Sequence, residues 1–285
     1  MRLLKFILIF TGILLVSAFL APLIYQCTSF KFERILSRLV TVFSLVTVFL
    51  FVRKRSENLG KYGLLWNEHS FAFITRGFLI GFITLGLLTA VEIILGGRQF
   101  SNNWDPAWKV GVQIVQYLCI SLFVGFLEEF FFRGFIFGQL KANFSTFVGL
   151  LGTNLVYASL HFFKGGGYVV PDHPNFIDSF KVMVHLADPF FHAARLWPSF
   201  LGLLFFGTIL SFGFLRTGSL FLSIGIHAGC VFFLKVDNWF VVSVPTASTL
   251  LFGDKNLYSG LFGWFFLGLL YLFLNRAYPN KSISL

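Results

Sequence analysis

Long apolar stretches are the sequence feature that most constrains what this chain can fold into. A stretch of about 20 predominantly apolar residues can cross a bilayer as an α-helix, and a helix satisfies its own backbone hydrogen bonds in lipid. Such stretches recur along the 285 residues. They predict about eight spans, near residues 3–25, 36–52, 74–95, 110–132, 144–163, 199–215, 218–235 and 258–275. We therefore expect an all-α, multi-pass transmembrane helical bundle.

Composition supports this expectation. Only 12% of the residues are charged, whereas soluble domains carry about 25%. The net charge is +10, but Lys and Arg gather at the ends of the apolar stretches, which is typical of membrane topology rather than nucleic-acid binding. Cys27, Cys119 and Cys230 are scattered and predict neither a disulfide framework nor a thiol redox or metal motif. The expected partners are a lipid bilayer and no nucleic acid.

Basic residues near the first two spans predict the orientation of the chain. The first stretch follows Arg2 and Lys5, but it is longer than the core of a signal peptide and lacks a clean cleavage site, so we expect a membrane anchor. The short loop from Arg53 to Lys61 is strongly basic, which favours the cytoplasmic side. Alternation of eight spans then places both termini in the cytoplasm.

Two connections between the spans are polar. Residues 96–108 predict an interfacial loop. Residues 164–198 form a longer connection, in which Gly and Pro residues break regular structure. It carries His173, His185 and His192, which we expect to be solvated rather than to act as ligands.

Ionisable residues inside the fourth stretch are the first candidates for chemistry. Glu128 and Glu129 are adjacent, and Arg133 follows in a run that is otherwise almost entirely apolar. Ionisable groups at membrane depth cost at least a few kcal/mol each, so they are rarely present without a use. On a helix Glu129 and Arg133 are i,i+4 neighbours that can neutralise each other, whereas Glu128 is rotated by about 100° and lacks this partner. Such a carboxylate is a candidate acid or base.

Two histidines lie in other apolar stretches. His161 ends the fifth stretch, and Tyr157 and Asn154 lie one and two turns before it on the same helix face. His227 lies inside the seventh stretch. Because Glu128 and the two histidines come from separate helices, they can meet only in the interior of the bundle. Water is the natural reactant there, since a carboxylate can take its proton while imidazoles orient it or stabilise an oxyanion.

These residues carry a resemblance to a known family. Glu128-Glu129-x-x-x-Arg133, then Tyr157-x-x-x-His161, then His227 in a later span, resemble the three ordered motifs of the CPBP family. That family comprises CAAX-type prenyl endopeptidases and bacteriocin-processing or immunity-associated membrane proteases. The resemblance covers about residues 110–235.

The resemblance implies an organisation for the whole chain. Residues 1–109 would hold N-terminal transmembrane helices and an interfacial loop, residues 110–235 the catalytic core, and residues 236–285 a final loop, the last helix and a short tail. We expect an integral multi-pass protein of a bacterial plasma membrane.

The resemblance also implies a role for each matching residue. Glu128 would be the base that activates water, and His161 would hold that water with it. His227 would polarise the scissile carbonyl. Glu129 and Arg133 would be structural or would help to position substrate, and Tyr157 and Asn154 would support the site.

The chain departs from the family at one position. The last motif often continues to an asparagine four residues after the histidine, and Val231 stands there instead. A second oxyanion donor is therefore missing at that position. Asn154, Ser223 or Cys230 could take its place, or turnover could be reduced or absent.

The sequence leaves the cofactor open. No His-Glu-x-x-His motif is present, so the chain is not a zincin. Glu128, His161 and His227 could hold zinc with an open coordination position, or they could work without a cofactor as a glutamate protease. The resemblance to prenyl endopeptidases favours the metal-free chemistry.

Three functions compete. The leading hypothesis is an intramembrane endopeptidase that cleaves a membrane-associated peptide or protein, lipidated or not, near the membrane face. One alternative is a catalytically weak relative that binds a hydrophobic peptide, as in immunity, for which Val231 is the best support. The other is a proton-coupled transporter, since buried Glu and His also serve as proton relays. Transporters more often show repeated halves, and the sequence shows no such repeat.

Overall fold

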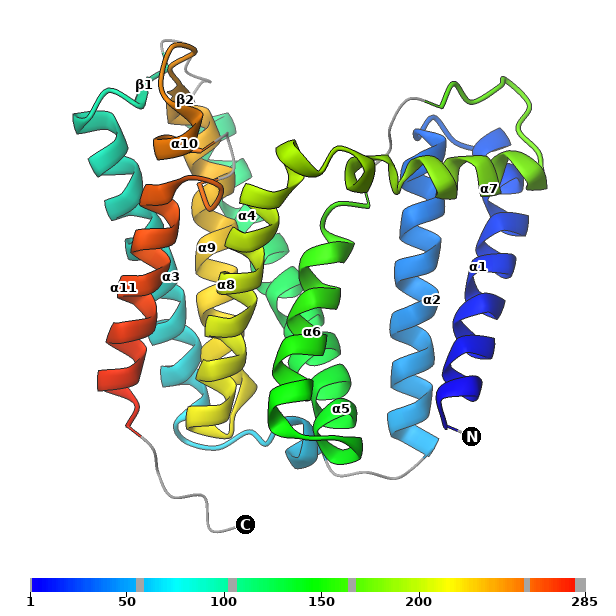
Figure 1. Ribbon diagram of the computed structural model, residues 1–285, viewed down its shortest axis with the longest axis horizontal. Helices are drawn as coiled ribbons and strands as arrows, with labels where there is room; N and C mark the ends of the chain where they lie inside the picture. The colour runs from blue at the N-terminus through cyan, green and yellow to red at the C-terminus, as the bar shows by residue number, and fades with distance from the viewer. Residues whose placement is uncertain (1, 55–58, 102–106, 164–167, 254–256, 280–285) are drawn as a thin grey trace. The chain divides into compact units, whose positions relative to one another are not determined.

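Apolar helices occupy the stretches that the sequence predicts as membrane spans (Figure 1). The computed structural model describes residues 2–54, 59–101, 107–163, 168–253 and 257–279. In these residues six helical stretches are long and apolar enough to cross a membrane, and two shorter apolar helices accompany them. This confirms the multi-pass helical bundle. The helices are α1 (Arg2–Gln26), α2 (Phe32–Lys54), α3 (Ser70–Ile94), α4 (Ala107–Glu129), α6 (Thr146–Leu160), α8 (Ala193–Thr217), α9 (Leu220–Phe240) and α11 (Leu261–Ala277).

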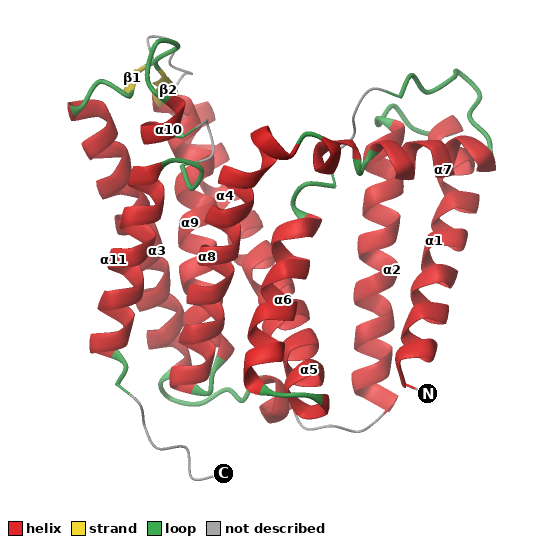
Figure 2. Cartoon of the chain, viewed as in Figure 1, coloured by secondary structure: helices red, strands yellow, loops and turns green. Residues whose placement is uncertain are grey.

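Short elements connect these helices (Figure 2). They are the 3-10 helices η1 (Leu59–Tyr62) and η3 (Asp188–Phe191), the π-helical segment η2 (Phe130–Phe137), the helices α5 (Gly138–Asn143), α7 (Phe176–His185) and α10 (Thr249–Phe252), and the strands β1 (Arg98–Phe100) and β2 (Val241–Ser243). The two strands pair antiparallel, with Phe100 opposite Val241. Residues 55–58 of the basic loop and 102–106 of the first polar loop lie outside the described residues, as do the glycines at 165–167.

The chain divides into two compact units, and the first comprises Met1–Glu57 and Leu160–Leu196. It is built on the α1–α2 pair, against which α7 packs. Phe32 and Leu36 of α2 and Val182 of α7 belong to one buried apolar cluster. The Ser179 hydroxyl donates to the backbone carbonyl of Ala18 over 2.8 Å, which fixes α7 against α1.

Helix α7 corrects the expectation that residues 164–198 form an irregular connection. The side-chain oxygen of Asn175 accepts from the backbone N–H groups of Ile177 and Asp178, and the Asp178 carboxylate accepts from the backbone N–H of Asn175. This N–H and the Tyr168 hydroxyl hold the pKa of Asp178 below its ordinary value. A reciprocal cap of this kind is a recognised helix-start pattern, so the sequence did contain a signal for α7.

The second unit comprises Asn58–Ser159 and Trp197–Leu285, and α9 lies at its centre. Its closest neighbour is α3, and glycines make the approach possible. A Cβ at Gly77 or Gly81 of α3 would meet backbone carbonyls of α9, and a Cβ at Gly225 or Gly229 of α9 would meet backbone carbonyls of α3. Small residues four apart on both helices are a common way for membrane helices to pack backbone against backbone.

Helix α4 also packs closely on α9 at a glycine. A Cβ at Gly125 would lie 3.1 Å from the carbonyl oxygen of Ile224 and 3.2 Å from the backbone nitrogen of Ala228. Because Gly125 precedes the two glutamates by one turn, this contact places them beside the turn of α9 that carries His227.

A buried ionic cluster lies near the C-terminal end of α9. Nε of Arg98 in β1 donates to Glu92 of α3 over 2.6 Å, and Nη1 donates to Asp237 of α9 over 3.2 Å. All three side chains are almost fully buried. The cluster ties the strand pair to α3 and α9.

Candidate active site

Glu129 and Arg133 form the buried ion pair that their spacing predicts. Nη1 of Arg133 lies 2.7 Å from Oε1 of Glu129, and both side chains are fully buried. Arg133 belongs to the π-helical segment that begins directly after Glu129. π-helical turns are rare and occur frequently at functional sites. The turn is therefore a second indication, besides the buried charges, that this region is functional.

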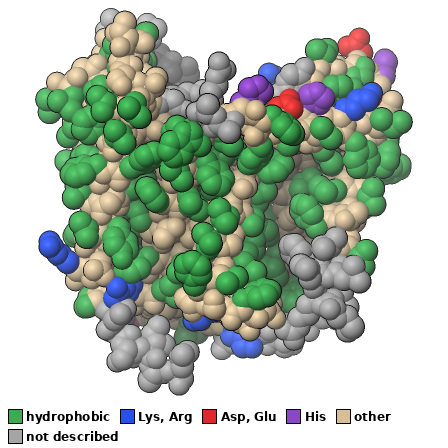
Figure 3. All heavy atoms as spheres, viewed as in Figure 1, with side chains coloured by type: hydrophobic (Ala, Val, Ile, Leu, Met, Phe, Trp, Pro, Cys, Tyr) green, Lys and Arg blue, Asp and Glu red, His purple; other side chains and the backbone are tan. Residues whose placement is uncertain are grey.

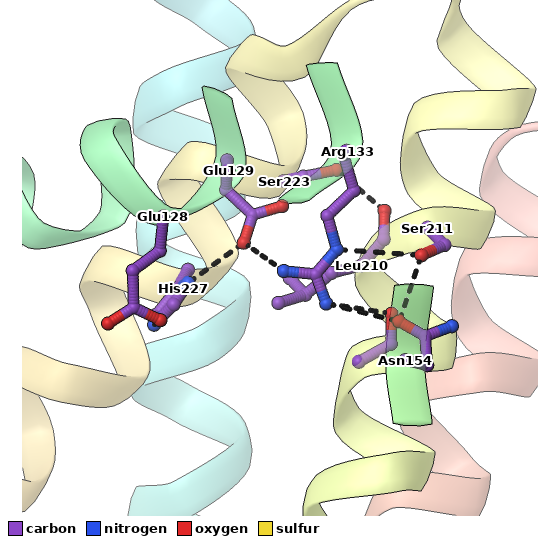
Figure 4. Close-up of polar contacts among 9 residues, drawn as sticks. Glu128, Glu129, Arg133, Asn154, Leu210, Ser211, Ser223 and His227 are labelled. Atoms are coloured by element: carbon purple, nitrogen blue, oxygen red, sulfur yellow. Dashed lines mark hydrogen bonds and ion pairs between the residues drawn. The ribbon is translucent and has the colours of Figure 1, made fainter. Parts of the chain in front are cut away.

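Two neighbouring helices hold the guanidinium of Arg133 (Figure 4). Nη2 donates to the carbonyl oxygen of Gly207 on α8 over 3.0 Å and to the side-chain oxygen of Asn154 on α6 over 3.4 Å. Nε reaches the Ser211 hydroxyl at 3.5 Å. The charge also stacks over the ring of Tyr157, 4.5 Å from its centroid. Arg133 therefore joins η2, α6 and α8 around the site.

His227 of α9 lies between the two glutamates (Figure 4). Nδ1 is 2.9 Å from Oε1 of Glu129, and Nε2 is 3.7 Å from Oε2 of Glu128. The ring meets Phe206 and Tyr157 edge to face, with centroid separations of 5.7 and 6.3 Å. These contacts fix the plane of the imidazole, so that each nitrogen faces a different carboxylate.

Glu128 is the exposed member of this group. Its side chain is 29% exposed, whereas that of His227 is 3% exposed. Its carboxylate lies beside His227, as the expected meeting of these two residues in the interior of the bundle requires. A separation of 3.7 Å is too long for a direct hydrogen bond. One water or substrate atom placed between them could contact both groups.

The structure brings together two of the three residues expected to be catalytic. Glu128 and His227 both belong to the second unit. His161 follows the end of α6 and belongs to the first unit, so its participation stays a prediction. Tyr157 is buried between the Arg133 guanidinium and the His227 ring, as a supporting residue would be.

The side chains considered as substitutes for the missing asparagine all donate elsewhere. The amide nitrogen of Asn154 donates to the Thr208 hydroxyl over 3.4 Å. The Ser223 hydroxyl donates to a backbone carbonyl of α8 over 2.8 Å, and the Cys230 thiol contacts a backbone carbonyl of α3 at 3.6 Å. These contacts favour helix packing as their role and assign no second oxyanion donor beside Val231.

The described donors do not by themselves fit a zinc centre. Among the residues that the structure describes, no group of three or more His, Cys, Asp or Glu side chains could hold a metal ion. Catalytic zinc sites use three protein ligands. Glu128 and Nε2 of His227 supply two donors, and Glu129 is engaged by Arg133 and Nδ1 of His227.

Two features of the site were not anticipated from the sequence. One is the hydrogen bond between Glu129 and His227, and the other is the contact of Arg133 with α8. Gly207 and Ser211 are small residues four apart on an apolar helix, which is a pattern typical of close helix contacts in membranes. That pattern was available in the sequence, but it does not tell which helix lies against it.

Comparison with known proteins found one family model that matches the part of the chain holding the site. The model of the type II CAAX prenyl endopeptidase Rce1-like family matches residues 110–233. The matched residues include every candidate catalytic and supporting residue, and they confirm the resemblance carried by the three motifs. The comparisons with curated proteins and with solved structures gave no significant match.

Proposed function

Because residues 110–233 match the model of the Rce1-like family of type II CAAX prenyl endopeptidases, we propose that this chain is an intramembrane endopeptidase. It cleaves a peptide bond near the membrane face with a water molecule that Glu128 activates. The observation that carries this proposal is the Glu128 side chain, which is partly exposed and whose Oε2 lies 3.7 Å from Nε2 of His227 within an otherwise buried polar cluster. A base must reach solvent or substrate, and Glu128 has the more exposed side chain of the two glutamates.

The chemistry follows from the positions of the two carboxylates. Glu128 takes a proton from water as the water oxygen attacks the scissile carbonyl carbon. Glu129 is neutralised by Arg133 and fully buried, so it is suited to holding the site together rather than to meeting substrate. The family motif implies that His161 would hold the attacking water. We propose that no metal is needed for this step.

An apolar cavity lies in the second unit, apart from Glu128. It has a volume of about 390 Å³ and is lined by residues of α4, α9 and neighbouring segments, among them Leu122, Phe126, Phe221 and Ile224. Leu122 and Phe126 lie on the face of α4 that carries Glu129 and are turned by about 120–160° from Glu128, so this cavity is not at the proposed base. We propose from the family match that the substrate is a membrane-associated peptide or protein, with or without a lipid group.

Val231 favours a second candidate function. A protein of this family with a weakened oxyanion site could bind a hydrophobic peptide without turning it over, as an immunity-type protein would. Peptide binding would then be retained, whereas Glu128 would be dispensable for it.

Co-expression with a library of tagged membrane peptides tests the proposal. Fragments should appear with wild type and disappear with Glu128→Gln at equal protein levels. Tight binding of one peptide by both proteins without fragments would favour the immunity-type function instead. Proton-dependent uptake of a solute by proteoliposomes, without cleavage, would point to a transporter.

A further inference from the structure

Helix α7 of the first unit carries an apolar strip on its outward surface. Its inner face is buried, and Ser179 and Val182 lie on that face. Ile177 and Val184 lie about 140–160° around the helix from Ser179. They are 63% and 64% exposed. Because Ile177 and Val184 are two turns apart on the same side of the helix, they form one apolar strip along α7.

The other side of this outward surface is polar. Lys181 and His185 lie there one turn apart, and Asp178 lies at its edge. Tyr168 covers this side, since its hydroxyl donates to Asp178 over 2.7 Å and its ring centroid lies 5.3 Å from that of His185. The Lys181 side chain stays 52% exposed. An apolar strip beside a basic, polar strip is typical of a helix that lies in a membrane interface.

The contact between α7 and α1 sets the depth of α7 along α1. The Ser179 hydroxyl donates to the backbone carbonyl of Ala18. The apolar span of α1, Leu8–Gln26, has 19 residues. At 1.5 Å per residue it is about 28 Å long, close to the hydrocarbon thickness of a bilayer of about 30 Å. Ala18 lies about 12 Å before the end of this span. Helix α7 therefore packs where acyl chains meet headgroups, and not above the membrane.

The surroundings of α7 within the first unit are those of a lipid-facing surface. Helices α1 and α2 are both long and apolar enough to cross a membrane. Figure 1 shows α7 lying across them, where α1 ends and α2 begins. Phe19 and Leu23 of α1 are exposed at this level. Figure 3 shows Asp, Lys and His side chains gathered at this end of the first unit, with hydrophobic side chains beneath them. Acyl chains that cover Phe19 and Leu23 can therefore extend onto the apolar strip of α7.

We propose that α7 is an interfacial helix that lies in the plane of the membrane. Its apolar strip, Ile177 and Val184, inserts among lipid acyl chains, and its polar side faces the headgroups. Lys181 is placed to contact lipid phosphate groups, to which a positive charge is attracted. The surface that covers the strip is lipid and not a second protein chain. The proposal goes beyond the endopeptidase function and does not depend on it.

Collision rates of spin labels test this placement. Single-cysteine variants of the full chain, with the three native cysteines replaced, would be labelled and reconstituted in liposomes. Oxygen concentrates in the hydrocarbon, whereas a nickel chelate stays in water. Labels at Ile177→Cys and Val184→Cys should show a high ratio of oxygen to nickel collisions, near that of Val42→Cys in the middle of α2. The label at Lys181→Cys should show a low ratio, near that of Asp172→Cys in the loop before α7.

Two results would overturn the proposal. A low ratio at both Ile177→Cys and Val184→Cys, equal to that of Asp172→Cys, would place α7 in water above the membrane. Few collisions with either reagent at these two positions would show that protein covers the strip instead of lipid. Phe180→Cys, on the apolar side of the same surface, gives a second probe if Ile177→Cys or Val184→Cys does not fold.

Discussion

At the scale of single residues, the two adjacent glutamates have separate surroundings and separate tasks. Glu129 is fully buried against Arg133 and His227, and Glu128 is partly exposed. The i,i+4 spacing to Arg133 predicted the ion pair, because it depends only on helix geometry. The contact of each glutamate with His227 depends on how α4 lies against α9, and spacing along one helix carries no such information.

The first prediction concerns the stability of the two buried glutamate–arginine pairs. Glu129→Gln should lower the free energy of unfolding by about 3–5 kcal/mol, because it leaves the Arg133 charge without its carboxylate. Glu92→Gln should cost less, since Arg98 keeps Asp237 at 3.2 Å. Reversible unfolding in mixed micelles measures both. If Glu92→Gln lowered the free energy of unfolding as much as Glu129→Gln or more, the Glu129–Arg133 pair would not be the more stabilising of the two.

The second prediction concerns position 231. Val231→Asn should raise the turnover number with little change in KM, because it adds a hydrogen-bond donor one turn after His227. One oxyanion donor is worth about 10²–10³ in rate, which sets the upper limit of the gain. Steady-state kinetics against a Val231→Ile control measure it. A fall in turnover with an intact fold would mean that the oxyanion does not lie near this position.

At the scale of secondary-structure elements, the sequence predicted the helices better than their packing. Apolar length located all the long helices, because membrane spans must be helical over about 20 residues. It missed α7, whose cap at Asn175 was readable, and the pairing of β1 with β2, which joins segments far apart in the chain. It also left the partners of α9 open, since a glycine spacing marks a contact face without naming the other helix.

The third prediction tests the contact between α3 and α9. Gly229→Ala should destabilise the protein strongly, because the added Cβ meets the backbone carbonyl of Phe78, which cannot rotate away. Overpacking in a tight interior costs about 1–3 kcal/mol or more. Activity should fall with it, since α9 carries His227. Thermal unfolding in detergent measures the effect, and Gly268→Ala is the control because a Cβ there meets nothing within 4 Å. Equal melting temperatures in the two variants would argue against the packing described.

At the scale of the whole molecule, we propose an orientation for the second unit from its charges. Lys61, Arg76, Lys141, Arg216 and Arg276 lie toward the end where α3 begins and α8 and α11 finish. Figure 3 shows hydrophobic side chains covering the visible sides of these helices and Lys and Arg side chains near that end. An excess of positive charge at one end is typical of the cytoplasmic side. His227 lies seven residues after Leu220, or about 10 Å along α9 from this end.

The fourth prediction follows from this charge distribution. In a chain whose three cysteines have been replaced, Ser145→Cys between α5 and α6 should react with a membrane-impermeant maleimide only from the cytoplasmic side. Ser248→Cys, before α10 at the opposite end, should react only from the outside. Labelling of intact cells and of inverted vesicles measures both. The reverse pattern would place the basic end outside and refute the proposed cytoplasmic location of both termini.

The central claim is that Glu128 activates the water that cleaves the substrate, and single-turnover cleavage tests it most directly. Wild type and Glu128→Gln would be purified, shown to unfold at the same temperature, and reconstituted in liposomes with a peptide that wild type cleaves. The account predicts a loss of at least about 10²–10⁴-fold in Glu128→Gln, the range expected for a missing general base. It also predicts that a strong chelator leaves the wild-type rate unchanged. Full activity of Glu128→Gln on that peptide would contradict the account.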